Sequence, residues 1–362
     1  MYHKLQKRPI ETLEQLHHDL QLAIELEFST LPVYLTALYS IKEGTNQCAY
    51  TVIRSVVMEE MFHLTNAANL LIATGGSPAI NNPEFLPTFP TKLPDGETWF
   101  EADLQPFSPA ALRNFLKIEM PADLAKADDI TIGEFYVGIE NGLETLHNRY
   151  GPALFPADCH DKQIAHKYYY GGGGEITPIT DLDSANFALN AIVAQGEGVP
   201  EKHWNPTQPF PLGETTGIDS GDHQLFMQPR ELSHYYRFNE LLLGYRYVQG
   251  DTPDSGPTGP AIPIDYRQVY PVLKNPQPEN YHAFGAIARL DTEFNLTLSL
   301  LLDQLHLAFN GQPDILVAAV GTMFGLKEKA QNMMRVPLPD GSGHHAAPTW
   351  RYIPIDKRPG AC

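Results

Sequence analysis

The sequence has little that would crosslink a protein or anchor it in a membrane. Its 362 residues include three cysteines, Cys48, Cys159 and Cys362, whose spacing matches neither a disulfide framework nor a zinc site. No window reaches the roughly 18 uninterrupted apolar residues of a membrane span, and no apolar segment follows the basic residues of the N-terminus. A chain of this length can bury a large core without crosslinks. We therefore expect a cytoplasmic protein with no membrane partner.

Positive charge is also scarce. Lysine and arginine total 25 against 43 aspartates and glutamates, which gives a formal net charge of -18. Such a chain repels phosphate backbones, so we expect no nucleic-acid partner.

Strand signals are sparse, whereas apolar residues recur at helical spacing along most of the chain. Thr12 is placed to cap the first helix, and Pro32 is expected to kink it. The motif "TIGE" predicts a capping box between Thr131 and Glu134. The fold class predicted is all-α, with helices over about 12–41, 48–73, 110–118, 131–150, 182–195, 229–248, 284–309 and 314–334.

Long irregular segments separate these helices. Residues 77–107 and 250–278 are rich in proline but also in apolar and aromatic residues, which indicates ordered loops. We expect residues 1–250 to form a helical bundle with crossover insertions. Residues 251–362 should add a proline-rich segment, two helices and an irregular tail that pack on the bundle as one compact unit. The glycine run 171–174 could approach a ligand closely, but a flexible connector is the commoner role.

Charge occurs where an apolar helix is expected, in "VVMEEMFHLTNAANLL". Glu60 and His63 form Glu-x-x-His, and this spacing sets both side chains on one helical face. Apolar residues follow the same face, so both should point inward. A buried carboxylate costs several kcal/mol unless a cation or hydrogen bonds compensate it. The pattern therefore predicts a partner for this pair.

A second Glu-x-x-His pair, Glu231 and His234, lies on a separate expected helix. In di-metal carboxylate bundles, two helices each supply Glu-x-x-His and two others each supply one glutamate. Glu27 lies on the apolar face of the first helix and is the candidate for the third helix. For the fourth helix the sequence leaves three candidates, in the order Glu197, Glu134 and Glu140.

The chemistry of this set favours two iron ions, with manganese as the alternative, because carboxylate and imidazole ligands suit both. Tyr34 and Tyr136 lie near the expected ligands and could act as hydrogen-bond donors or redox partners, although such residues are more often simply core. Buried salt bridges to Arg54, Arg237 or Arg246 are the competing explanation for the inward carboxylates. Arg237 could instead pair with a ligating carboxylate.

Several segments together resemble one known family. These are "LAIELEFSTLPVYLTALYSI", "EEMFHLTNAANLLIATGGSP", "TIGEFY", "IVAQGEG", "SHYYRF" and the C-terminal "AFNGQPDILVAAVGTMFGLKEKA" through "AAPTWRY". They are similar to the ferritin-like domain family associated with the violacein-pathway iminophenylpyruvate dimer synthase. The resemblance implies a ferritin-like four-helix bundle with additional helices and a metal pair held by the residues named above. It also implies work on amino-acid-derived molecules in specialised metabolism. That synthase is much longer than this chain, so its dimerising activity does not carry over.

These observations lead to a first functional hypothesis, a non-haem di-iron oxidoreductase. It would use dioxygen to oxidise, desaturate or couple a small amino-acid-derived substrate. The competing hypotheses are an iron-binding or ferroxidase protein without an organic substrate, and a non-catalytic partner subunit of a biosynthetic complex. Exposed helical faces would also suit a homodimer.

Overall fold

The computed structural model describes residues 8–92, 101–121, 131–196, 232–248, 251 and 255–359. Within these residues the regular structure is helical, and strand pairing is confined to isolated bridges. This confirms the predicted all-α class. No helix in the described ranges is both long and apolar enough to cross a membrane. The α-helices are α1 (Leu13–Ser40), α2 (Gln47–Ala73), α3 (Pro109–Ile118), α4 (Ile132–Tyr150), α5 (Leu182–Gly196), α7 (His234–Leu243), α8 (Gly285–Phe309) and α9 (Ile315–Met334).

Helix boundaries follow the local signals in the sequence closely. Thr12 caps α1 through the backbone N–H of Gln15, and α1 continues through Pro32. Thr131 and Glu134 form the predicted capping box at the start of α4. Capping satisfies backbone N–H groups that the first helical turn leaves without partners.

The prediction of a helix over 229–248 is wrong in length. Leu232 and Ser233 are not helical, and α7 begins at His234 and ends at Leu243. Gly244 then adopts a left-handed conformation with φ 78°, which is a common way to end a helix. His234 therefore occupies the first position of its helix.

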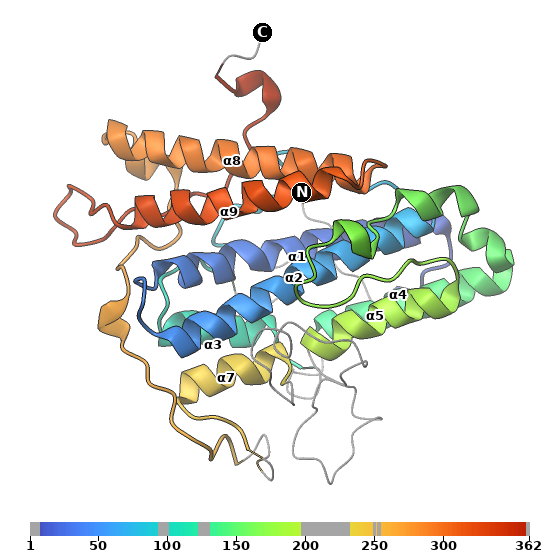
Figure 1. The fold of residues 1–362 in the computed structure, drawn as a ribbon, viewed down its shortest axis with the longest axis horizontal. Helices are drawn as coiled ribbons and strands as arrows, with labels where there is room; N and C mark the ends of the chain where they lie inside the picture. Colours follow the sequence, from blue (N-terminus) through green and yellow to red (C-terminus); the bar gives the residue numbers. More distant parts are fainter. Residues whose placement is uncertain are drawn as a thin grey trace.

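The helices form three layers (Figure 1). The α1–α2 hairpin lies in the middle, α8 and α9 cover one side, and α3, α4, α5 and α7 cover the other. Helices α1 and α2 are consequently buried around most of their circumference. Helices that are apolar on all sides need such an interior position.

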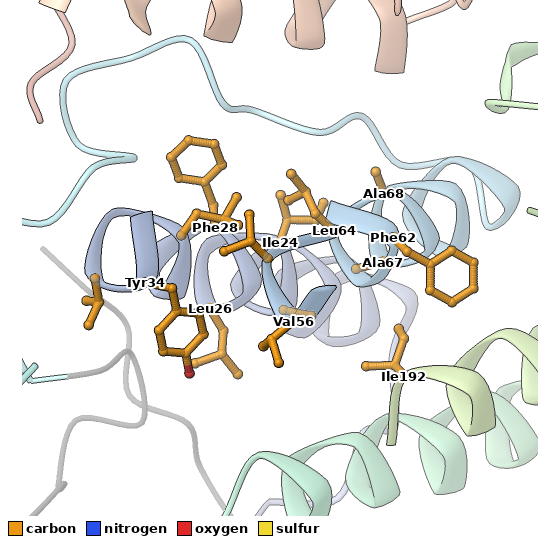
Figure 2. Close-up of a cluster of buried hydrophobic side chains, with 14 of the residues drawn as sticks. Ile24, Leu26, Phe28, Tyr34, Val56, Phe62, Leu64, Ala67, Ala68 and Ile192 are labelled. Carbon is orange, nitrogen blue, oxygen red and sulfur yellow. The ribbon is translucent and has the colours of Figure 1, made fainter. Parts of the chain in front are cut away.

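The main apolar core extends along both faces of this hairpin. Figure 2 shows Phe28 and Leu64 on the side of α8 and α9, whereas Tyr34 and Val56 point to the opposite side, where Ile192 of α5 lies. Trp350 of the C-terminal tail joins the same core, and its indole N–H donates to Thr36 of α1 at 3.0 Å. The two faces of the hairpin thus border different parts of the protein.

The glycine run 171–174 packs directly against α2. Gly173 has φ +83°, and a Cβ atom built on it would lie 2.4 Å from the carbonyl oxygen of Met58. A Cβ on Gly174 would meet the Phe62 ring at 2.7 Å. The expectation of a loose connector is therefore wrong, because these glycines allow the loop backbone to approach the helix closely.

Candidate metal centre

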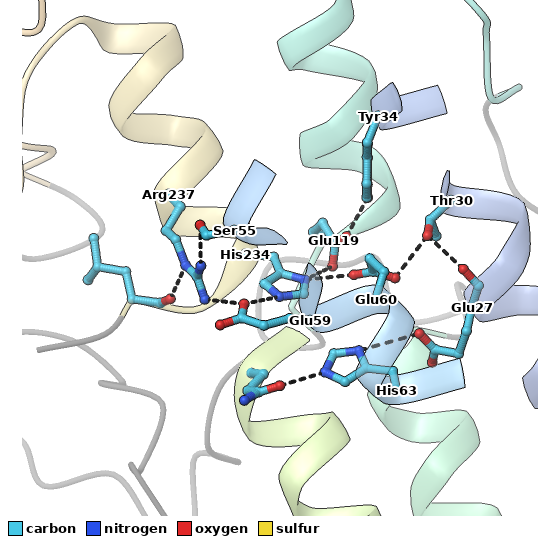
Figure 3. Close-up of polar contacts among 12 residues, drawn as sticks. Glu27, Thr30, Tyr34, Ser55, Glu59, Glu60, His63, Glu119, His234 and Arg237 are labelled. Carbon is cyan, nitrogen blue, oxygen red and sulfur yellow. Dashed lines mark hydrogen bonds and ion pairs between the residues drawn. The ribbon is translucent and has the colours of Figure 1, made fainter. Parts of the chain in front are cut away.

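A cluster of buried ionisable side chains lies on the face of α1 and α2 that borders α3, α5 and α7 (Figure 3). Each of its carboxylates and imidazoles is 3% exposed or less. Its members come from α1 (Glu27), α2 (Glu59, Glu60 and His63), the residue that ends α3 (Glu119) and the first residue of α7 (His234). Helices distant in sequence thus deliver charge to one dry interior.

One group of potential ligand atoms comes from Glu27, Glu60 and His63. One atom of each side chain lies within 4.8 Å of the others, and His63 Nδ1 is 3.4 Å from Glu27 Oε2. Glu60 and His63 share a face of α2, as the Glu-x-x-His spacing predicts. Glu27 reaches them from the neighbouring helix α1.

A second group comes from Glu60, Glu119 and His234, again with one atom of each side chain within 4.8 Å of the others. His234 Nδ1 lies 2.9 Å from Glu60 Oε1 and 3.5 Å from Glu119 Oε2. Glu60 therefore belongs to both groups. The rings of His63 and His234 are stacked with centroids 5.5 Å apart, which keeps the two groups next to each other.

Glu59 fixes the orientation of the His234 ring by contacting its Nε2 atom, on the side of the ring opposite Glu60. Its Nε2 lies 2.8 Å from Glu59 Oε2, and the same oxygen accepts a hydrogen bond from Arg237 Nη2 at 2.5 Å. A carboxylate only accepts hydrogen bonds, so His234 Nε2 must carry the proton. The other nitrogen, Nδ1, then faces the carboxylates of Glu60 and Glu119.

His63 is held in a comparable way by an amide. Its Nε2 lies 2.9 Å from Gln195 Oε1, and the amide nitrogen of Gln195 donates to the carbonyl oxygen of Gly173 at 2.9 Å. That second bond fixes the orientation of the amide, so Nε2 of His63 is the donor. Nδ1 of His63 is therefore left to face Glu27.

Hydroxyl groups complete the surroundings of the carboxylates. Tyr136 donates to Glu27 Oε1 at 2.5 Å, Tyr34 donates to Glu119, and Thr30 lies 2.8 Å from Glu60 Oε2. Burial, and then the nearby carboxylates, raise the pKa of both tyrosines well above the ordinary value. Both phenols therefore stay protonated and act as donors.

Burial and neighbouring charges shift the pKa values of several side chains in the cluster. Burial, and then the charge of Glu119, raise the pKa of Glu60 to about 7. Burial opposes a charged imidazole, but Glu119 and then Glu59 and Glu60 outweigh it and raise the pKa of His234 well above its ordinary value. Glu59 behaves differently, since Arg237 and His234 offset its burial and hold its pKa below the ordinary value.

These residues fit a pair of metal ions. Within the described residues the four carboxylates contact one guanidinium, that of Arg237, so with all four ionised even two protonated imidazoles would leave negative charge in excess. His234 Nδ1 also has no hydrogen-bond partner of good geometry, although it points at Glu60. Oxygen and imidazole nitrogen ligands suit iron and manganese. A cavity of about 20 Å³ between the ligand atoms, also lined by Gly133 and Ile192, leaves room for little more than a small ligand.

The predicted ligands have different outcomes. Glu27, Glu60, His63 and His234 meet in the cluster, and the proposed partners Tyr34, Tyr136 and Arg237 each contact one of its carboxylates. Glu197 and Glu231 lie outside the described residues.

Glu134 does not reach the cluster. Its side chain is exposed and bonds to the backbone N–H of Thr131, so the capping box accounts for this residue. Glu140 is half-buried and belongs to neither ligand group. The candidacy of Glu134 is therefore wrong, because the first turn of α4 directs its side chain back to the helix terminus.

Sequence reasoning missed Glu119, Glu59 and Gln195. Glu119 directly follows the apolar run of α3 and lies three and four residues after the buried Leu116 and Phe115, a spacing that could have placed it on the buried face. The supporting roles of Glu59 and Gln195 depend on contacts with residues more than 100 positions away, so no local signal points to them.

Comparison with known proteins places this geometry in context. The family model described as ferritin-like matches residues 20–243. A curated relative, dichlorochromopyrrolate synthase from Lentzea aerocolonigenes, is 22% identical over 420 aligned positions, which include 97% of this chain. The chain spans 37% of the length of that relative. A crystal structure of a ferritin-like protein from Caulobacter vibrioides shares the fold, with a TM-score of 0.60 and 22% identity over 96% of this chain and 100% of that one.

Proposed function

This chain belongs to the ferritin-like family, and we propose that it is a non-haem di-metal oxidoreductase that works with two iron ions and dioxygen. Its substrate would be a small amino-acid-derived molecule that is oxidised, desaturated or coupled. The curated relative is a synthase, which supports an enzymatic role for this chain.

The observation that carries the proposal is the sharing of Glu60 by two overlapping ligand groups. One ion would be bound by Glu60 together with Glu27 and His63. The other ion would be bound by Glu60 together with Glu119 and His234. A carboxylate has two oxygens and can bind two cations at once, whereas a network of buried salt bridges depends on cationic side chains to compensate its carboxylates. Arg237 is the one guanidinium that bonds to this cluster within the described residues.

The protein's own residues would prepare this centre in advance. Glu59 and Gln195 hold the protons on the outer imidazole nitrogens, which leaves Nδ1 of His234 and Nδ1 of His63 directed inward. Such outer partners orient metal-binding histidines and raise their basicity. Tyr34 and Tyr136 hold one oxygen each of Glu119 and Glu27.

When bound, the iron pair would supply open coordination positions at which dioxygen can be reduced by electrons from the substrate. The protein excludes bulk water, because every member of the cluster is almost fully buried. Tyr34 and Tyr136, whose phenols stay protonated, would hold protons beside Glu119 and Glu27.

Metal content tests the proposed centre directly. We expect the purified protein to bind two iron or manganese ions per chain by elemental analysis, and Glu60→Ala to bind none, because both groups lose a ligand. Glu119→Gln should keep one ion, since the group of Glu27 and His63 remains intact. The matched control Glu134→Gln should keep both. Two ions retained in Glu60→Ala would refute the ligand assignment, and a metal-free wild-type protein would favour the partner-subunit hypothesis.

Oxygen consumption separates enzyme from iron handling. The reduced, iron-loaded protein should consume dioxygen faster when aromatic amino acids or their imines are added, and mass spectrometry should detect oxidised or coupled products. Oxygen uptake that follows only the amount of ferrous iron supplied would identify a ferroxidase instead.

A further inference from the structure

A second site lies on the opposite face of the α1–α2 hairpin. There a cavity of about 410 Å³ opens between this hairpin and the α8–α9 pair. Its walls are formed mainly by leucine, methionine and aromatic side chains, among them Leu31, Leu64, Met323 and Trp350. Pockets of 300–1,000 Å³ with apolar walls and few polar groups are typical of small-molecule sites.

This cavity is separate from the metal cluster. The residues that line it include none of the candidate ligands, and the small space at the cluster shares no lining residue with it. Figure 1 shows α1 and α2 between α8–α9 and the layer that contains α3, α4, α5 and α7. In Figure 2, Phe28 and Leu64, which line the cavity, point toward α8 and α9, away from Tyr34. A ligand in the cavity would therefore not contact the metal ligands.

Two cations lie at the cavity and have no carboxylate partner within the described part of the chain. Arg54 is exposed, and Lys327 Nζ lies 5.3 Å from the ring centroid of Tyr50, which also lines the cavity. Tyr170 lies close enough to Arg54 for that charge to affect its hydroxyl. In a chain with a net charge of -18, two cations without a carboxylate partner beside one apolar cavity indicate a place for an anionic group.

We propose that this cavity binds an apolar, ring-containing molecule with one anionic group, whose rings lie between α1–α2 and α8–α9 and whose anion meets Arg54 and Lys327. The apolar walls provide the hydrophobic term, and the cations determine the orientation.

The size of the cavity favours a small molecule over a protein segment. A cavity of roughly 150 Å³ lined by similar side chains accepts benzene, so 410 Å³ holds on the order of two or three rings. Eight of the lining side chains are aromatic, which favours stacking against flat rings. The lining also includes the Phe324 ring, which is 63% exposed.

The test uses a matched pair of fluorescent probes on the full-length protein. 1-Anilinonaphthalene-8-sulfonate carries three rings and one sulfonate, and N-phenyl-1-naphthylamine is the same molecule without the sulfonate. We expect one binding site per chain for the sulfonate probe, with a lower dissociation constant than that of the neutral probe. Arg54→Gln combined with Lys327→Gln should weaken the sulfonate probe roughly fivefold and leave the neutral probe unchanged. Equal affinities for both probes in wild type and variant would overturn the anionic part of the proposal.

A second pair of variants tests the location. Val320 lines the cavity on α9, and Val320→Phe should weaken both probes roughly tenfold because the added ring occupies their space. Val317 lies on the same helix, is 62% exposed and does not line the cavity, so Val317→Phe is the matched control. Circular dichroism and melting temperature verify that both variants fold. Equal probe affinity in the two variants would overturn the proposal, and so would light scattering that shows a dimer in wild type and a monomer in Val320→Phe.

The metal proposal does not influence this result. Glu60→Ala, which disrupts the metal cluster, should bind both probes as wild type does. Failure of the metal centre and failure of the apolar site are therefore separate outcomes.

Discussion

The buried pair of Arg237 and Glu59 offers a prediction in which a second substitution repairs the damage of the first. The Arg237 guanidinium donates to Glu59 Oε2 at 2.5 Å, to Ser55 Oγ at 3.1 Å and to the carbonyl oxygen of Leu232 at 2.8 Å. Arg237→Met removes all three donors and takes the guanidinium away from the Glu59 carboxylate, which is 0% exposed and then keeps only its contact with His234 Nε2. Removing one partner of a buried charge pair costs about 3–5 kcal/mol of unfolding free energy.

Glu59→Gln has opposite effects in the two backgrounds. In the wild-type background it replaces a charged acceptor of Arg237 by a neutral one, and we expect a loss of about 2 kcal/mol. In the Arg237→Met background it removes the carboxylate charge that has lost its guanidinium, while the amide oxygen still accepts from His234. The double variant should therefore be roughly 2 kcal/mol more stable than Arg237→Met alone.

Urea unfolding of the metal-free protein at pH 8 measures all four proteins in one double-mutant cycle. The exposed pair of Arg267 and Asp265 provides the control, since Arg267 is 88% exposed and ion pairs at the surface add little to stability. Arg267→Met and Asp265→Asn should therefore act additively. The reasoning fails if Glu59→Gln destabilises the protein equally in both backgrounds, because Glu59 would then not depend on Arg237 for its charge.

Three further predictions concern the same region. The metal-free protein should lose about 3 kcal/mol of unfolding free energy as pH rises from 4.5 through 7, because folded Glu60, with its pKa of about 7, keeps a proton that the unfolded chain has released. Calorimetry of the metal-free protein that shows no such fall would contradict this. Gly173→Ala should lower the melting temperature more than Gly171→Ala does. Both glycines have positive φ, but only at Gly173 would the added Cβ lie within 3 Å of the α2 backbone. Equal shifts in melting temperature would argue against the close approach of the loop to α2. Tyr136→Phe should weaken metal binding about tenfold in a chelator competition titration, because Glu27 loses a donor, whereas the exposed Tyr150→Phe should have no effect.

The sequence predicted most helices because their signals are local. Capping residues such as Thr12 and Thr131 and the period of the apolar residues lie within a few positions of the structure that they determine. The start of α7 was missed, because Ser233, with φ -58° and ψ 163°, is not helical. His234 is therefore the first helical residue, and no helical spacing connects it to earlier positions.

The candidate site was predictable to the extent that it depends on helical spacing. Glu60 and His63 share one face of α2 for a local reason, and Glu27 lies on the inward face of α1. The choice among the remaining glutamates depends on how helices pack. Glu119 enters the cluster because α3 lies against α1 and α7, and this contact joins parts of the chain more than 100 residues apart.

By itself, therefore, the sequence determined the helices, the inward placement of one Glu-x-x-His pair and the scarcity of cations to balance it. Only the tertiary structure decided that Glu119 rather than Glu134 joins the pair, that Glu59 and Gln195 hold the imidazoles, and that an apolar cavity opens behind the hairpin. The physical reason is the distance along the chain over which each interaction acts. Backbone hydrogen bonds and capping act within one helical turn, whereas charge clusters and cavities form where helices distant in sequence meet.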